Sequence, residues 1–202
     1  MKIGIMGGTF DPVHNGHLTL AEYACQDFHL DQVWFMPNGN PPHKDNKNIV
    51  STPRERARMV SLAISGYRNF RLEDYELRRK DVSCSYRTME HFRELYPQHH
   101  FYFIIGADSL FSIEQWVHVE RLFPTCTILA AYRDDKSSRE VMGRQIRMLT
   151  GKYGADIRLL NTPLVDVSSH ELRRMLRDRE DVGGLMPEAV LDYIYRNRLY
   201  TS

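Results

Sequence analysis

Two glycines and two histidines near the N-terminus form the first group of residues that could bind a phosphate. Residues 7–17 read GGTFDPVHNGH, and Gly7 and Gly8 directly follow a short apolar run. Because glycine has no Cβ, the backbone at these positions can approach a ligand closely. His14 and His17 can both project from the start of one helix, where unpaired N–H groups and a partial positive charge favour an anion. Considered without its neighbours, such a histidine pair is more often a surface feature beside a turn.

A second basic segment lies in a loop with little apolar content. Residues 38–44 read NGNPPHK, so Asn38 opens the segment and His43 and Lys44 follow two prolines. The prolines stiffen the backbone, and the two basic side chains could close over a triphosphate and supply positive charge there. A lone His-Lys pair in a loop is usually only solvated. The surrounding stretch, residues 37–53, is long for a loop in a compact domain, and such loops often carry function.

A third segment combines two hydroxyls with an arginine. Residues 167–173 read VSSHELR. Ser168 and Ser169 stand at a predicted helix start and offer hydroxyls and backbone donors. Arg173 lies about one turn further on, where its guanidinium can bind phosphate through several donors. As a bare pattern this is an N-cap followed by a cation, which needs no ligand.

Two further residues follow a predicted strand and suit a nucleoside. Residues 104–109 read IIGADS, which places Asp108 where its carboxylate could bind ribose hydroxyls. Trp116 comes next, and a tryptophan near such a site can stack on an aromatic ring. On general grounds, a packing role for this tryptophan is about as common as a binding role.

Apolar runs and turn residues predict the elements that position these segments. Strands are expected at residues 2–6, 32–36, 70–75, 101–105, 127–132 and 157–160. Helices are expected at residues 17–28, 53–65, 85–96, 138–150 and about 168–177, with a last helix that opens at Pro187. Strands that alternate with helices predict an α/β fold with a mostly parallel sheet covered on both faces. Ligands of such sheets bind at the carboxyl ends of the strands, where the strand-end loops of this chain fall.

Length and composition exclude several classes of protein. The chain has 202 residues and a net charge of +1, with ordinary globular composition, whereas proteins on nucleic acid polymers usually have a basic excess. The start reaches glycine too soon for a signal peptide, and no apolar run is long enough for a membrane span. Three separated cysteines indicate reduced, mostly buried thiols in the cytoplasm, not a disulfide framework or a zinc site. We expect one cytoplasmic domain over residues 1–202, with a helical C-terminal part from about residue 165.

Residues 7–17 resemble the signature of the nucleotidylyltransferase superfamily, in which His-x-Gly-His lies beside a glycine-rich turn. Residues 41–44 resemble its pyridine-nucleotide branch, and residues 168–173 resemble its Ser-Ser/Thr-x-x-x-Arg element for the β- and γ-phosphates. From about Lys2 to Tyr200, the order of all segments is similar to that of the bacterial nicotinate mononucleotide adenylyltransferases. This resemblance implies a Rossmann-like, doubly wound sheet. It also implies adenylyl transfer from ATP to nicotinate mononucleotide, which gives deamido-NAD and pyrophosphate in NAD biosynthesis.

Together with that resemblance, the motifs assign roles to individual residues. Catalytic roles fall to His14, His17, Lys44 and Arg173. ATP binding falls to Gly7, Gly8, Thr9, Phe10, His43, Arg133, Ser168 and Ser169. Mononucleotide binding falls to Asn38, Ser85, Arg87, Gly106, Asp108 and Trp116. No metal ligand is assigned, because Mg²⁺ is expected to bridge the phosphates of ATP, held mainly by substrate and water.

The expected chemistry needs no covalent intermediate. The 5′-phosphate of the mononucleotide attacks the α-phosphorus of ATP in line, and it is already ionised at pH 7, so no general base is required. The protein must supply position and positive charge. We expect His14 and His17 at the α-phosphate, and Lys44 and Arg173 at the leaving pyrophosphate.

The chain departs from the family pattern at two positions. The family has Ser-Tyr-Thr where residues 85–87 are Ser-Tyr-Arg, and it commonly has threonine where this chain has His170. A cation at Arg87 could favour nicotinate over neutral nicotinamide, or could simply point to solvent. The sequence leaves open the preference between these acceptors and whether the chain forms a homo-oligomer.

Three other functions fit part of the pattern. An adenylyl- or cytidylyltransferase of the phosphopantetheine type would be shorter and would lack the Pro-Pro-His-Lys and Gly-Ala-Asp…Trp segments. A nucleotide-binding regulator without turnover would not need the histidines, Lys44 and Arg173, which are all present. An NAD-dependent dehydrogenase would show Gly-x-Gly-x-x-Gly after the first strand, and this chain does not.

Overall fold

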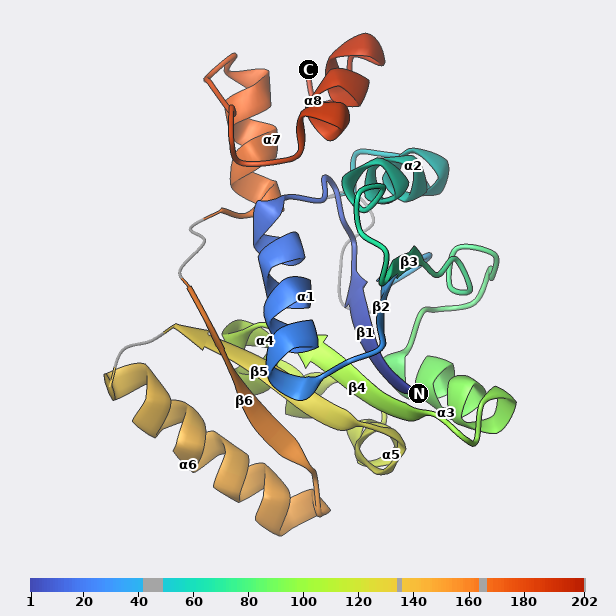
Figure 1. The fold of residues 1–202 in the computed structure, drawn as a ribbon, viewed down its shortest axis with the longest axis vertical. Coiled ribbons are helices and arrows are strands. Elements are labelled where there is room, and N and C mark those ends of the chain that lie inside the picture. Colours follow the sequence, from blue (N-terminus) through green and yellow to red (C-terminus); the bar gives the residue numbers. More distant parts are fainter. Residues whose placement is uncertain (42–48, 134–135, 164–166, 202) are drawn as a thin grey trace.

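A single parallel sheet organises the chain in a computed structural model that describes residues 1–41, 49–133, 136–163 and 167–201. Within these residues six strands pair in the order β3-β2-β1-β4-β5-β6, and every neighbouring pair is parallel (Figure 1). The strands are β1 (Lys2–Gly8), β2 (Gln32–Pro37), β3 (Phe70–Leu72), β4 (His100–Ile105), β5 (Thr127–Arg133) and β6 (Ile157–Thr162). The strand order reverses between β1 and β4, which confirms the predicted Rossmann-like, doubly wound sheet.

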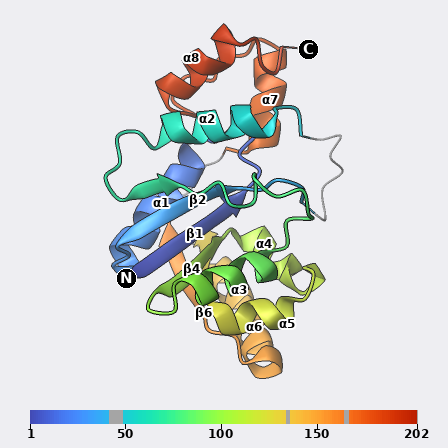
Figure 2. The same ribbon diagram turned by 90° about the vertical axis from the view of Figure 1, so that its right-hand side faces the viewer.

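Helices cover both faces of this sheet. The described helices are α1 (Asn15–Phe28), α2 (Pro53–Ala63), α3 (Ser85–Leu95), α4 (Ala107–Ser112), α5 (Val119–Leu122), α6 (Lys136–Tyr153), α7 (Ser169–Arg177) and α8 (Glu188–Arg196), with the short 3-10 turns η2 (Ile113–Gln115) and η3 (Phe123–Thr125). Side chains of α1, α2, α7 and α8 contribute to one buried apolar cluster, and side chains of α3 to α6 contribute to another. Figure 2 shows these two groups of helices on opposite sides of the sheet. The sheet therefore lies between two cores.

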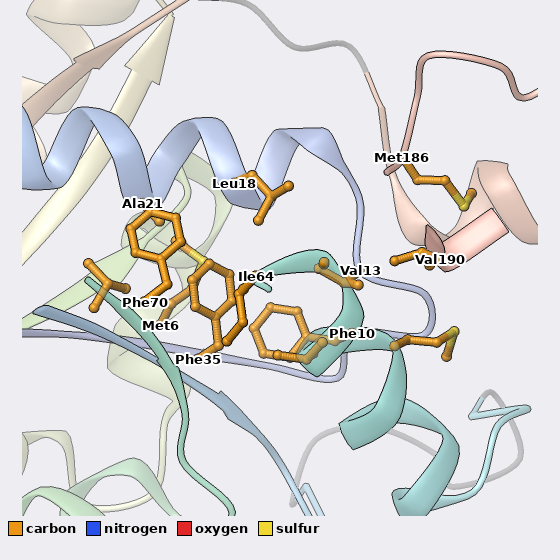
Figure 3. Close-up of a cluster of buried hydrophobic side chains, with 14 of the residues drawn as sticks. Met6, Phe10, Val13, Leu18, Ala21, Phe35, Ile64, Phe70, Met186 and Val190 are labelled. Atoms are coloured by element: carbon orange, nitrogen blue, oxygen red, sulfur yellow. The ribbon is translucent and has the colours of Figure 1, made fainter. Parts of the chain in front are cut away.

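Residues of β1 divide between these two cores. Ile3 and Ile5 are fully buried in the cluster that includes α3 to α6, whereas Met6 faces the cluster that includes α1 and α2. The cluster that includes α1 and α2 continues past the end of β1, through Phe10, to Val190 of the last helix (Figure 3). The core thus joins the turn after the first strand to the C-terminal helices.

Most predicted elements are present, with ends that shift by a few residues. The strand expected at 70–75 ends at Leu72; the amide of Glu73 makes one more bond to β2, 2.8 Å from the carbonyl of Phe35, and a turn follows. The short helices between residues 107 and 125 were not predicted, since none is long enough to show a helical apolar period.

The cysteines and the helices give two further comparisons with the sequence. All three cysteines are free; Cys84 is buried, whereas Cys25 and Cys126 are only partly buried, so the prediction of mostly buried thiols was too strong. Among the described helices, none combines the length and the apolar content needed to cross a bilayer.

Candidate active site

The glycine turn after β1 leads directly into α1. A Cβ on Gly8 would lie only 3.1 Å from the ring of Phe10. Phe10 has a left-handed backbone, with φ of 52°, and its ring is buried against the ring of His17 at a centroid distance of 4.9 Å. The sequence predicts that Phe10 binds ATP; because its side chain belongs to the core, its backbone is the part left to face a ligand.

The two histidines pack together at the start of α1. His14 is the N-cap, and its backbone N–H donates to Nδ1 of His17 at 3.2 Å, with the two ring centroids 3.8 Å apart. Burial lowers the pKa of His14 to about 4, so its imidazole is neutral at pH 7. Its Nδ1 is buried and makes no hydrogen bond within the described part of the chain. His14 therefore offers a neutral imidazole, not a cation, to a ligand.

The start of α7 is bonded to the turn that follows β1. Ser168 caps the helix by accepting from the amide of Glu171 at 3.1 Å. The hydroxyl of Ser169 donates to the carbonyl of Pro12 at 2.9 Å, and Nη1 of Arg173 donates to the carbonyl of Asp11 at 2.7 Å. These bonds join parts of the chain that are 157 and 162 positions apart.

One cleft of about 1020 Å³ brings the predicted segments together at the carboxyl ends of β1 and β4. Gly8, His17 and Arg173 all line it. The predicted site residues along its wall are Gly7, Gly8, Thr9, Phe10, His14, His17, Asn38, Ser85, Gly106, Asp108, Trp116, Ser168, Ser169 and Arg173. The cleft lies where the strand order reverses, which is the usual place for a ligand in such a sheet.

The side of the cleft at β4 carries the residues predicted for the mononucleotide. Gly106 is the N-cap of α4, and the space where its Cβ would stand is open to at least 4 Å. Asp108 follows in the first turn and is exposed. Trp116 is partly buried and meets the ring of Phe103 edge-on, at a centroid distance of 6.0 Å. Gly106 therefore leaves open space at this wall, and the partly buried indole of Trp116 lines the same cleft.

Four predicted residues are not placed in the cleft. Arg87 does not line it: its side chain is exposed, and its Nε donates to the hydroxyl of Tyr86 at 2.8 Å. Of the two alternatives for Arg87, the structure favours the one in which the cation points to solvent. His43 and Lys44 lie outside the described residues, and the structure describes Arg133 only as the end of β5, without its side chain.

Arg56 is a functional candidate that the sequence analysis missed. Its side chain is 1% exposed, and it donates from Nη1 to the carbonyl of Thr9 at 2.8 Å and from Nη2 to the carbonyl of Asn38 at 2.7 Å. The guanidinium thus fixes the end of β1 against the end of β2, at two residues predicted to bind nucleotides. A signal was present, because Arg56 has the helical spacing of the buried apolar residues Met59, Val60 and Ala63.

Glu76 is a second missed residue, and it also lines the cleft. Its carboxylate is 6% exposed and accepts from the hydroxyl of Thr88 at 2.8 Å, while burial raises its pKa. Ser83 also bonds to this carboxylate, and its hydroxyl accepts from the amides of Gly39 and Asn40 at 3.1 Å each. No pattern in the sequence marks Glu76, because it lies in a polar turn.

Comparison with known proteins identifies the family. A Clostridium botulinum protein assigned as a nicotinate-nucleotide adenylyltransferase is 36% identical over 197 residues, which are 97% of each chain. A Clostridium novyi protein with the same assignment is 36% identical over 98% of each chain. The chain belongs to the nicotinate-nucleotide adenylyltransferase family. A family model described as cytidylyltransferase-like matches residues 5–175, in agreement with this nucleotidyltransferase family.

Solved structures of such adenylyltransferases share the fold. The Plasmodium falciparum nicotinic acid mononucleotide adenylyltransferase complexed with NaAD has a TM-score of 0.80 and 21% identity, over 98% of this chain and 97% of that one. The same enzyme complexed with APC has a TM-score of 0.78, with 98% and 96% covered. The adenylyltransferase family and the doubly wound sheet predicted from the sequence are both confirmed.

Proposed function

We propose that this chain transfers the adenylyl group of ATP to nicotinate mononucleotide and releases deamido-NAD and pyrophosphate, as a step of NAD biosynthesis. The observation that carries the proposal is the single cleft lined by Gly8, His17 and Arg173 as well as by Asp108 and Trp116. Its volume of about 1020 Å³ lies at the upper end of the roughly 300–1,000 Å³ usual for small-molecule sites. Direct transfer of the adenylyl group requires that ATP and the mononucleotide bind side by side, and a cleft of this volume suits two nucleotides.

The reaction follows from position and charge. The phosphate of the mononucleotide is ionised at pH 7 and attacks the α-phosphorus in line, the bond to the β-phosphate oxygen breaks, and pyrophosphate leaves. His14 and His17 are proposed to bond the α-phosphate, with His14 as a neutral group because burial lowers its pKa to about 4. Arg173 is proposed to stabilise the pyrophosphate, assisted by Lys44.

The remaining assigned residues divide between the two substrates. The ATP side is proposed to comprise Gly7, Gly8, Thr9, the backbone of Phe10, His43, Arg133, Ser168 and Ser169. The mononucleotide side is proposed to comprise Asn38, Ser85, Gly106, Asp108 and Trp116, with the aspartate at the ribose and the indole on the pyridine ring. Because Arg87 does not line the cleft, discrimination for nicotinate is proposed to come from other groups.

Mg²⁺ is proposed to enter with ATP, as part of the substrate. Within the described residues there is no group of three or more His, Cys, Asp or Glu side chains placed to hold a metal. Two of the carboxylates that line the cleft already accept hydrogen bonds, from Tyr200 to Asp11 and from Thr88 to Glu76. The phosphates of ATP and water are proposed as the main ligands of the ion.

We also infer that residues 1–202 form one nucleotidylyltransferase domain, with the helical part from about residue 165 packed on it. In support, the amide of Asn15 donates to the carbonyl of Leu185 at 2.9 Å, and α8 contacts α2. A cytoplasmic location is proposed because three free thiols suit a reducing compartment.

The test is pyrophosphate release with ATP and Mg²⁺ against three acceptors: nicotinate mononucleotide, nicotinamide mononucleotide and phosphopantetheine. We expect the highest kcat/KM with nicotinate mononucleotide and formation of deamido-NAD in equal amount to pyrophosphate. Higher kcat/KM with either other acceptor would replace the proposed substrate. ATP binding without pyrophosphate release from any acceptor would support a regulator instead.

A further inference from the structure

The carboxylate of Asp11 is the centre of a buried polar network beside the cleft. Asp11 is 1% exposed and lies in the turn between β1 and α1. Its Oδ2 accepts from the amide of Val50 at 2.8 Å, and its Oδ1 accepts from the amide of Ser51 at 3.2 Å and from the hydroxyl of Tyr200 at 2.6 Å. A carboxylate buried to this degree needs such hydrogen-bond partners to compensate for the water that it has lost.

Tyr200 brings the C-terminal end of the chain to this carboxylate, across 189 positions of sequence. It is 4% exposed, and its hydroxyl also accepts from the hydroxyl of Ser51 at 2.6 Å. Burial raises the pKa of Tyr200, so the phenol stays protonated and donates to Asp11. No local sequence pattern links this tail to the site.

Asp11 and its neighbour Pro12 are joined to two parts of the cleft wall, the helix α7 and the segment at residues 49–51. Its carbonyl accepts from Arg173 at 2.7 Å, and the carbonyl of the next residue, Pro12, accepts from Ser169 at 2.9 Å. Ile49, which precedes the two amides bound by the carboxylate, lines the cleft directly. A shift of Asp11 would therefore move both the arginine and the glycine turn.

Two cations lie in the electrostatic field of this network. The carboxylate of Asp11 opposes the lowering of the Arg56 pKa by burial, and the charge of Arg173 offsets a small part of the rise in the pKa of Tyr200 that burial causes. The carboxylate of Asp11 thus lies near two guanidinium groups: that of Arg56, which donates to the carbonyl of Thr9, and that of Arg173, which lines the cleft. Loss of this carboxylate would leave Arg56 with less compensation at a buried position.

We propose that Asp11 and Tyr200 are a pair of positioning residues that hold Arg173 and the glycine turn where the triphosphate of ATP binds. The proposal rests on the proposed function, since it concerns the ATP side of that cleft. Neither residue is expected to touch the reacting atoms. The tyrosine hydroxyl restrains the carboxylate, and the backbone of the aspartate restrains the guanidinium.

The first variant is Tyr200→Phe, which removes only the hydroxyl, and its matched control is Tyr195→Phe in α8, where the tyrosine is 56% exposed. We expect kcat/KM for ATP to fall about 10- to 100-fold in Tyr200→Phe, because small misplacements of binding groups have effects of this size. The KM for nicotinate mononucleotide should stay within about twofold, and Tyr195→Phe should match the wild type. A purely structural tail would lower the unfolding midpoint and leave both kinetic constants of the folded enzyme unchanged, which would overturn the proposal.

A double-mutant cycle with Asp11→Asn tests whether the two residues act as a unit. The asparagine keeps one acceptor oxygen but places N–H groups against the amides of Val50 or Ser51. If the pair acts through one contact, the double variant should lose no more kcat/KM for ATP than Asp11→Asn alone. Fully additive losses would contradict the pairing. Should Asp11→Asn not fold, Ser51→Ala takes its place in the cycle, since Ser51 bonds to the same hydroxyl.

Binding of ATP separates this inference from the proposed function. Calorimetry with Mg²⁺ and ATP alone should show a dissociation constant raised about 10-fold or more in Tyr200→Phe relative to wild type. If wild type releases no pyrophosphate but the variant still loses ATP affinity, the proposed reaction fails and the positioning pair stands. If wild type turns over normally and the variant binds ATP as tightly with unchanged kinetics, only the positioning pair fails.

Discussion

The histidine pair illustrates how burial sets the chemistry of a single residue. His14 is 7% exposed at the start of α1, and desolvation keeps it neutral, while His17 lies beside it and accepts a bond from its backbone. A neutral imidazole can bind a phosphate oxygen through an N–H group without adding charge, so His14 is proposed as a donor, and Arg173 and Lys44 are proposed as cations, at the triphosphate. In this proposal, His14 contributes a hydrogen bond to the phosphate, and Arg173 and Lys44 contribute positive charge.

Replacement of His17 by alanine should lower kcat by about 10²–10³-fold, since loss of one well-placed donor to a developing charge has that effect. Steady-state pyrophosphate release measures it. The control is His91→Ala in α3, a histidine that stacks on Tyr75 and is not among the residues that line the cleft. Turnover near that of the wild type in His17→Ala would remove His17 from the mechanism.

The pKa of His14 predicts how stability depends on pH. Below about pH 6.5 the unfolded chain binds a proton at this residue, whereas the folded chain does not until about pH 4. Stability is therefore full above pH 6.5 and is lost as the pH falls from 6.5 to 4, by about 3 kcal/mol in total.

Urea unfolding of wild type and His14→Gln at steps between pH 7 and pH 4 measures this effect, because titration of all other groups is shared by the two chains. The free energy of unfolding of the wild type should fall relative to that of the variant as the pH drops. A constant difference across the range would mean that His14 does not carry a depressed pKa.

At the scale of the elements, the sequence predicts those helices and strands whose apolar spacing and end residues are visible locally. The apolar run at Lys2–Met6 and its glycine stop gave β1, and the two serines gave the start of α7. The short helices between Gly106 and Thr127 could not be predicted, because each is stabilised by packing and not by a repeat of its own. Arg56 shows a third case, in which the helical spacing was visible but its bonds to Thr9 and Asn38 depend on the tertiary fold.

The turn after β2 offers a prediction of its own. A Cβ on Gly39 would lie 2.3 Å from the backbone carbonyl oxygen of Glu76, so Gly39→Ala must displace this segment. We expect a loss of about 1–3 kcal/mol in the free energy of unfolding, as for other overpacked sites. We also expect a several-fold higher KM for nicotinate mononucleotide, because Asn38 and Glu76 line that part of the cleft.

Gly66→Ala is the matched control, because nothing lies within 4 Å of the position of its Cβ. For both variants, chemical denaturation gives the free energy of unfolding, and titration of the acceptor gives the KM for nicotinate mononucleotide. An unchanged KM in Gly39→Ala, together with the expected loss of stability, would show that the segment is structural and does not position the acceptor.

At the scale of the whole molecule, the site depends on contacts that no local pattern contains. The sequence placed each motif at a strand end or a helix start, and the reversal of strand order then brings these ends to one cleft. It could not place the bond from Arg173 to Asp11 or that from Tyr200 to the same residue, since each crosses more than 150 positions. Such bonds follow from the docking of the C-terminal helices on α2 and on the turn after β1.

Ligand-induced stabilisation tests whether the cleft has two distinct halves. A ligand at 100 times its dissociation constant adds about 2.7 kcal/mol to the free energy of unfolding. For a chain of this length that corresponds to a rise in Tm of roughly 5–10 °C. We expect ATP with Mg²⁺, and separately nicotinate mononucleotide, each to raise the Tm of the wild type by this order.

Two variants should separate these shifts, because Arg173 and Trp116 are proposed for different substrates. In Arg173→Gln the shift with ATP should fall by at least half while the shift with the mononucleotide is kept. In Trp116→Ala the opposite should hold, since the indole that stacks on the pyridine ring is removed. Each shift is measured against the same variant without ligand, so a lower starting Tm does not affect the comparison. Loss of both shifts in either variant would mean that the two substrates share one set of contacts, and the division of the cleft would be wrong.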